Sequence, residues 1–173
     1  MDIHSVIDSP LGPIHLVADD VGRLTRVSFD LAVRSGTHGQ AGGLSGRAFT
    51  PEVFGVAERQ FGEYFAGERT SFELPYAARG TAFQERVWAE VAALPYGSTT
   101  SYGELTARVG ASRDRIRAVG AAVGANPLLI VVPCHRVVGA TGALTGYAGG
   151  IDRKRDLLTL EGALQPQLWG ALS

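Results

Sequence analysis

The apolar pattern of this chain changes from strand-like to helical along its length, and this change limits the folds open to it. Three β-branched segments alternate with the turn sequences SPLG and DDVG, at residues 3–8, 13–18 and 23–29. Such spacing favours an antiparallel meander. The Gly- and Ser-rich stretch at 34–49 is typical of a loop.

A helix and one more strand complete the predicted first half. Thr50 can cap the helix, Pro51 suits its first turn and Gly67 ends it. The segment Phe72–Leu74 is expected to form a short strand. The sequence YAARG at residues 76–80 is typical of a linker between the two halves.

Helical signals dominate the second half. Thr81 and Gln84 predict a capping box in front of an apolar stripe that includes Trp88 and ends at Pro95. Two short helices follow. Ser101 and Glu104 predict a capping box at the start of the first, Gly110 is expected to end it, and Ser112 can cap the second. This layout predicts a helix-turn-helix.

The second of these helices has two unlike faces. Its predicted buried stripe contains Ile116, Val119 and Val123. The same periodicity turns arginines and small residues toward solvent, namely Arg113, Arg117, Ala121 and Gly124. Such a face suits close approach to a large partner, although small residues also allow two helices to pack closely.

These patterns predict an α/β protein of two domains. Residues 1–77 would form an N-terminal antiparallel sheet with a flanking helix. Residues 78–165 would form a helical domain with the helix-turn-helix and a short active-site strand, and 166–173 a C-terminal tail.

Charge is divided unevenly between the two halves. Residues 1–77 carry 6 basic and 10 acidic side chains, a net charge of −4, whereas residues 78–173 carry 10 and 7, a net charge of +3. Only the second half is suited to a phosphate backbone. The N-terminus lacks the pattern of a signal peptide and no segment has the apolar length of a membrane span, so we expect a cytoplasmic protein.

The chain contains a single cysteine, in the sequence IVVPCHRVVGATG. One cysteine excludes an internal disulfide, and no cysteine–histidine cluster has zinc-site spacing, so we expect no metal. The apolar run 128–132 is typical of a buried strand, and Pro133 would end its ladder. Cys134 would then lie at the edge of the core, although a lone buried cysteine is more often inert.

Two neighbours favour a reactive thiol. His135 can accept the proton of Cys134, directly or through water. Glu161 shares a predicted helical face with Ile151 and Leu158 and therefore needs a buried partner, for which His135 is the simplest choice. The alternative is a helix cap or a surface ion pair with Lys154 or Arg155.

The stretch PCHRVVGATGALTGYAGG, taken with RAVGAAVGANP and Glu161, resembles the O6-alkylguanine-DNA alkyltransferases, also called methylated-DNA-protein-cysteine methyltransferases. The resemblance covers roughly residues 80–163. It implies irreversible, single-turnover transfer of a methyl or small alkyl group from O6 of guanine to Cys134, with His135 and Glu161 as a proton relay. It leaves transfer from O4 of thymine open.

Further roles follow from the same resemblance. Asn126 would be a hinge, Tyr102 would help to rotate the nucleotide and protonate guanine, and Arg117 would fill the gap left by the flipped base. Other DNA contacts are expected from Ser112, Arg113, Ala121 and Gly124. The guanine site would be lined by Trp88, Val137, Tyr147 and Ala148, the last of which stands where relatives often have serine.

The partner implied by the resemblance is double-stranded DNA containing O6-alkylguanine, bound by a monomer without a cofactor; cooperative binding is left open. Two other classes of function remain. A helix-turn-helix regulator would need the arginine face but not the thiol. A cysteine hydrolase would use Cys134, His135 and Glu161 for repeated turnover.

Overall fold

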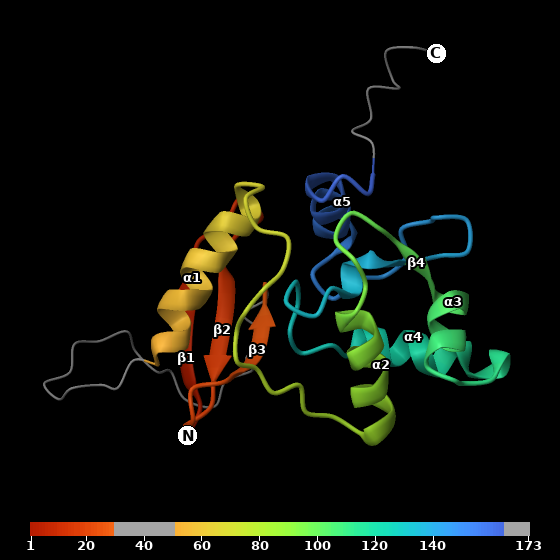
Figure 1. Ribbon diagram of the computed structural model, residues 1–173, viewed down its shortest axis with the longest axis horizontal. Coiled ribbons are helices and arrows are strands. Elements are labelled where there is room, and N and C mark those ends of the chain that lie inside the picture. The colour runs from red at the N-terminus through yellow and green to blue at the C-terminus, as the bar shows by residue number, and fades with distance from the viewer. Residues whose placement is uncertain (30–50, 165–173) are drawn as a thin grey trace, which may run out of the picture.

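The computed structural model describes residues 1–29 and 51–164. Strands β1 (Ile3–Ile7), β2 (Ile14–Ala18) and β3 (Leu24–Ser28) form an antiparallel sheet in the order β1-β2-β3. The predicted meander is therefore confirmed, and Figure 1 shows β3 as the strand nearest to the second half of the chain.

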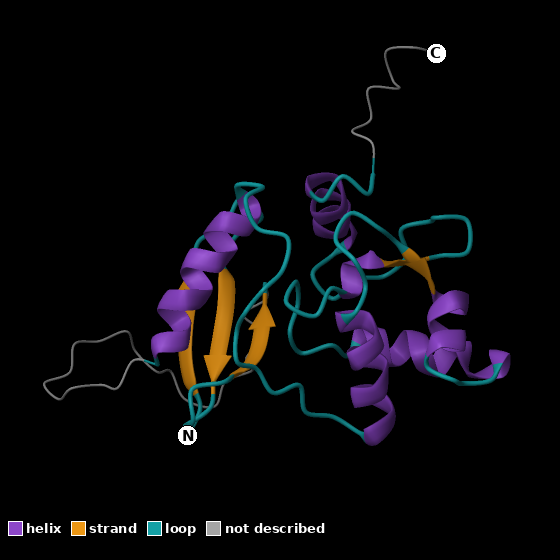
Figure 2. Cartoon of the chain, in the orientation of Figure 1, coloured by secondary structure: helices purple, strands orange, loops and turns teal. Residues whose placement is uncertain are grey.

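Helix α1 (Glu52–Phe65) lies along the sheet (Figure 2) and contributes Phe54, Phe61 and Tyr64 to the core that it shares with the strands. Gly67 ends it with a φ of +76°, as predicted. Pro51 precedes the helix as its N-cap and does not lie within the first turn. The predicted cap Thr50 and the predicted loop 34–49 lie outside the described residues.

The prediction of a strand at Phe72–Leu74 is wrong. The amide of Gln60, on α1, accepts a hydrogen bond from the backbone N–H of Glu73 at 2.9 Å and donates to its carbonyl at 3.1 Å. A side chain therefore satisfies the backbone groups that a neighbouring strand would otherwise pair.

The second half is helical, with α2 (Ala82–Ala92), α3 (Tyr102–Arg108), α4 (Ile116–Gly124) and α5 (Ile151–Leu160). Both bonds of the predicted Thr81 capping box are present. Ser101 accepts from the Glu104 N–H at 3.1 Å, which is one bond of the second predicted box. Gly110 follows α3 with a φ of +77°.

The helix-turn-helix of α3 and α4 is present, with two differences from the prediction. The Ser112 hydroxyl donates to the Asp114 carboxylate and does not cap the backbone, because the charged carboxylate is the stronger acceptor. Ile116 is 41% exposed, although Val119 and Val123 are buried as expected. A 3-10 turn, Arg113–Arg115, precedes α4 and leaves Ile116 at its exposed first position.

The run 128–132 is buried, but the prediction that it forms a strand is wrong. Ile130 has a φ of +72°, and the chain folds back so that the Val132 N–H donates to the Leu128 carbonyl at 2.9 Å. The short strand of this region comes after the cysteine, since β5 (Val137–Val138) pairs in parallel with β4 (Thr100–Ser101). Within residues 1–29 and 51–164, no helix is both long enough and apolar enough to cross a membrane.

Candidate active site

Cys134 begins a single 3-10 turn, Cys134–Arg136, immediately after the folded-back run. Cys134 is 4% exposed, and its backbone N–H donates to the Val132 carbonyl at 2.8 Å. Cys134 is therefore part of the buried core, and it follows a folded-back turn and not, as predicted, a strand that ends at Pro133.

Asn126 holds the loop that carries the thiol. Its side-chain oxygen accepts from the Leu128 N–H at 2.9 Å, and its Nδ2 donates to the Val132 carbonyl at 2.8 Å. One buried amide thus fixes both ends of the turn that leads to Cys134, and this geometry fits the hinge role expected for Asn126.

Glu161, the C-cap of α5, accepts four hydrogen bonds in a buried cluster. His135 Nε2 lies 2.7 Å from its Oε2, and the Tyr64 hydroxyl donates to the same oxygen at 2.5 Å. Arg136 donates from Nε to Oε1 at 2.7 Å and from Nη2 to Oε2 at 3.1 Å. The predicted contact between His135 and Glu161 is confirmed.

The alternative partners of Glu161 lie elsewhere. Lys154 is buried and its Nζ donates to the carbonyls of Val137 at 2.6 Å and Thr145 at 2.9 Å. Arg155 pairs with Asp152 on the exposed side of α5. The surface ion pair considered for Glu161 is therefore wrong.

The electrostatics of this cluster favour a neutral imidazole beside an ionised carboxylate. Burial alone would raise the pKa of Glu161, but hydrogen bonds from His135 and Arg136 lower it to about 2. Burial lowers the pKa of His135 and outweighs the opposing attraction of Glu161. A neutral His135 that donates from Nε2 to Glu161 carries its lone pair on Nδ1. That nitrogen is buried and has no hydrogen-bond partner among the described residues.

The thiol needs a base. Burial raises the pKa of Cys134 to about 11, although a hydrogen bond from Asn126 and the charge of Lys154 act in the opposite direction. The thiolate, not the thiol, is the nucleophile. The arrangement therefore combines a protonated thiol with an imidazole, on the next residue, whose Nδ1 has no partner among the described residues.

Two members of this cluster, Tyr64 and Arg136, were not predicted as site residues, and neither was Lys154, whose charge acts on the Cys134 thiol. Arg136 follows His135 directly, and a buried arginine beside a buried carboxylate could have been proposed from the PCHR sequence alone. Tyr64 is 97 positions away from Glu161, and nothing in its sequence context indicates the contact.

Tyr147 packs against His135. Its ring meets that of His135 edge-on, with centroids 6.4 Å apart, and its hydroxyl is buried without a hydrogen-bond partner among the described residues. A Cβ on Gly149 would lie 2.7 Å from the Tyr147 ring, so this position has room only for glycine. Val137 is buried, and the exposed Ala148 lines a neighbouring pocket.

Tyr102 and Trp88, two other residues expected at the site, make contacts outside the cluster around Glu161. Tyr102 is the first residue of α3, and its hydroxyl accepts from Thr145 at 3.5 Å. Trp88, expected at the guanine site, packs between α2 and α4, where its indole N–H donates to the Ala122 carbonyl at 2.7 Å. Its only polar atom is therefore used to join two helices.

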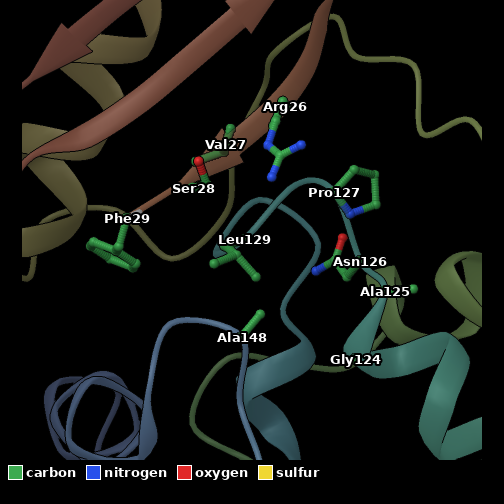
Figure 3. A pocket seen from close by; sticks show the side chains of 10 residues that line it. All are labelled: Arg26, Val27, Ser28, Phe29, Gly124, Ala125, Asn126, Pro127, Leu129 and Ala148. Carbon is green, nitrogen blue, oxygen red and sulfur yellow. The ribbon is translucent and has the colours of Figure 1, made fainter. Parts of the chain in front are cut away.

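The residues expected to contact DNA share an exposed surface. Ser112, Arg113 and Arg117 are exposed at the start of the helix, and Ala121 and Gly124 are exposed along α4. A pocket of about 320 Å³ lies at the far end of this surface, between α4 and β3 (Figure 3).

Comparisons with known proteins agree on one family. The family model described as "6-O-methylguanine DNA methyltransferase, DNA binding domain" matches residues 82–163, and that described as "6-O-methylguanine DNA methyltransferase, ribonuclease-like domain" matches residues 3–78.

Individual relatives match over nearly the whole chain. A methylated-DNA–protein-cysteine methyltransferase of Mycolicibacterium paratuberculosis is 45% identical over 158 residues, or 91% of each chain. One from Methanosarcina acetivorans is 42% identical over 92% of this chain and 98% of its own. The structure of Mycobacterium tuberculosis OGT in complex with DNA covers 95% of each chain, with 46% identity and a TM-score of 0.78. The chain therefore belongs to the methylated-DNA–protein-cysteine methyltransferase family.

Proposed function

We propose that this protein repairs DNA directly by moving a methyl or small alkyl group from O6 of guanine to Cys134. The thiol proton passes to Nδ1 of His135, directly or through a bridging water, and the thiolate attacks the alkyl carbon. The carbon–O6 bond breaks as the carbon–sulfur bond forms, and the departing guanine takes a proton. A thioether has no easy hydrolytic exit, so each molecule reacts once.

The observation that carries the proposal is the hydrogen bond between Glu161 and Nε2 of His135, which leaves Nδ1 of the residue next to the buried Cys134 without a partner among the described residues. Glu161 fixes the tautomer and stabilises the imidazolium that forms. Arg136 and Tyr64 keep Glu161 ionised, since both donate to it.

The substrate must be turned out of the duplex, because O6 of a stacked guanine cannot reach a thiol at the edge of a core. We propose that α4 enters the minor groove with its small residues, Ala121 and Gly124, and that Arg117 replaces the flipped base. Tyr147, Ala148 and the backbone of Val137 would hold the guanine, and Tyr102 would protonate it on departure.

The biological setting follows from the same proposal. We propose double-stranded DNA as the partner; the structure of the relative M. tuberculosis OGT in complex with DNA supports a DNA partner. We propose that the protein acts as a cytoplasmic monomer, with its domain boundary near residue 78. The proposed tail 166–173 lies outside the described residues.

The test is a titration of duplex DNA containing O6-methylguanine, followed by intact-mass and peptide mass spectrometry. The expected yield stops at one methyl group per protein, carried by the Cys134 peptide, and Cys134→Ser abolishes it. Repeated turnover would favour a cysteine hydrolase. Absence of a protein adduct, with DNA binding retained, would favour a regulator.

A further inference from the structure

The pocket between β3 and the end of α4 contains a positive charge that no carboxylate of the described residues balances. Its lining comes from β3 and the residue after it, from 124–127, and from Leu129 and Ala148. Arg26 is the only charged side chain among these residues. Figure 3 shows its guanidinium directed from β3 into the pocket, above Leu129.

Arg26 differs from the other arginines described in residues 1–29 and 51–79. Arg23 and Arg79 pair with Asp19, and Arg59 and Arg69 pair with Glu63. The side chain of Arg26 takes part in none of the ion pairs or hydrogen bonds of the described residues. An exposed guanidinium without a partner in residues 1–29 and 51–164 is a candidate for binding an external anion.

The other wall of the pocket belongs to the proposed DNA surface. Gly124 and Ala125 line the pocket at the end of α4, and nothing lies within 4 Å of where a Gly124 Cβ would be. The helix rises about 10 Å from Arg117 to Gly124. A duplex presents one phosphate per ~1.7 Å of its axis, so DNA docked on α4 carries several phosphates past this opening.

We propose that the pocket binds a backbone phosphate of the DNA and that Arg26 is its cation. The N-terminal domain then takes part in DNA binding, because the small residues at the end of α4 leave space for the phosphate while β3 supplies the charge. A guanidinium can bind a phosphate through two parallel hydrogen bonds. This inference rests on the proposed docking of DNA on α4, but not on alkyl transfer.

The test measures the affinity for an undamaged duplex by fluorescence anisotropy at salt concentrations from about 50 to 200 mM. Arg26→Gln should weaken binding, and the slope of log affinity against log salt should fall in magnitude by about one, the loss of one phosphate contact. Arg26→Lys should restore most of the slope. Arg155→Gln is the control, because it removes the same charge from an exposed pair on α5.

An unchanged slope in Arg26→Gln would overturn the proposal, and so would an equal change in Arg155→Gln, which would indicate only an effect of net charge. Transfer from free benzylguanine reports on the thiol site without DNA. A loss of that reaction in Arg26→Gln would show that Arg26 supports the fold, and would also overturn the proposal. The binding measurements use undamaged duplex and do not depend on alkyl transfer. If the wild-type protein accepted no methyl group from O6-methylguanine, the proposed function would be refuted, but the phosphate contact of Arg26 would stand.

Discussion

Replacing Glu161 with glutamine should both destabilise the protein and slow alkyl transfer. The carboxylate accepts four hydrogen bonds from His135, Tyr64 and Arg136, whereas an amide has one acceptor oxygen and one donor nitrogen. If the amide nitrogen faces Arg136, two donors meet. If it faces His135, the imidazole proton is forced onto Nδ1, which is then unable to accept the thiol proton.

The magnitude follows from the same contacts. A carboxyl whose pKa falls from 4.5 to about 2 on folding contributes roughly 3 kcal/mol at neutral pH. Removal of one partner from a buried ion pair costs about 3–5 kcal/mol, in agreement with that figure. A protein in the middle of the ordinary stability range, about 10 kcal/mol, stays folded after this loss. General-base assistance is worth about 10²–10⁴ in rate, so transfer should slow by at least ~100-fold.

Two assays check this prediction: urea unfolding and single-turnover transfer from a duplex containing O6-methylguanine. Affinity for the duplex should change little, since Glu161 is buried. Asp152→Asn is the control, because it removes a carboxylate that is almost fully exposed on the same helix. If the folded Glu161→Gln protein transferred methyl groups within threefold of the wild-type rate, the relay would be refuted.

Four other outcomes are expected. Arg117→Ala should react much more slowly with alkylated duplex but normally with free benzylguanine, which needs no flipping; an equal loss on both substrates would assign Arg117 to the fold. Asn126→Ala should lower the free energy of unfolding by about 1–3 kcal/mol and slow transfer to both substrates, because the loop before the thiol loses its buried hydrogen bonds; normal transfer would show that the hinge is dispensable. Gly149→Ala should slow benzylguanine transfer by displacing Tyr147, and a normal rate would contradict the close fit at this position. The folded pKa of Glu161 is below its unfolded value, so its contribution is complete above about pH 5.5 and is lost as the pH falls toward 2; urea unfolding across this range should show a flatter pH dependence in Glu161→Gln than in the wild type.

Local sequence signals predicted those parts of the fold that depend on local chemistry. The turns of the meander, the Thr81 capping box and the glycine after α3 each involve residues within a few positions of one another. Their outcome depends little on the rest of the chain, and the structure has all of them.

The two wrongly predicted strands share a physical cause. Phe72–Leu74 and 128–132 are both apolar segments whose backbone groups bond to a buried side-chain amide, from Gln60 in one case and from Asn126 in the other. The β-branched composition of 128–132 agrees with its burial, which is incomplete only at Val131, whereas in Phe72–Leu74 only Leu74 is buried. It cannot predict that a side-chain amide takes several of the backbone groups, while the Leu129 N–H still donates to the Val27 carbonyl of β3.

Sequence reasoning predicted site residues that lie close to Cys134 and on the helix that ends at Glu161, but none from the first half of the chain. The position of Glu161 on an apolar helical face required a buried partner, and its neighbour in space proved to be His135. The hydroxyl of Tyr64 comes from the other half of the chain, and burial raises its pKa, so it remains protonated and donates to Glu161. The sheet half therefore acts on the thiol through Glu161. A helical half separated from Tyr64 would keep the PCHR sequence and lose one of the donors that hold its carboxylate ionised.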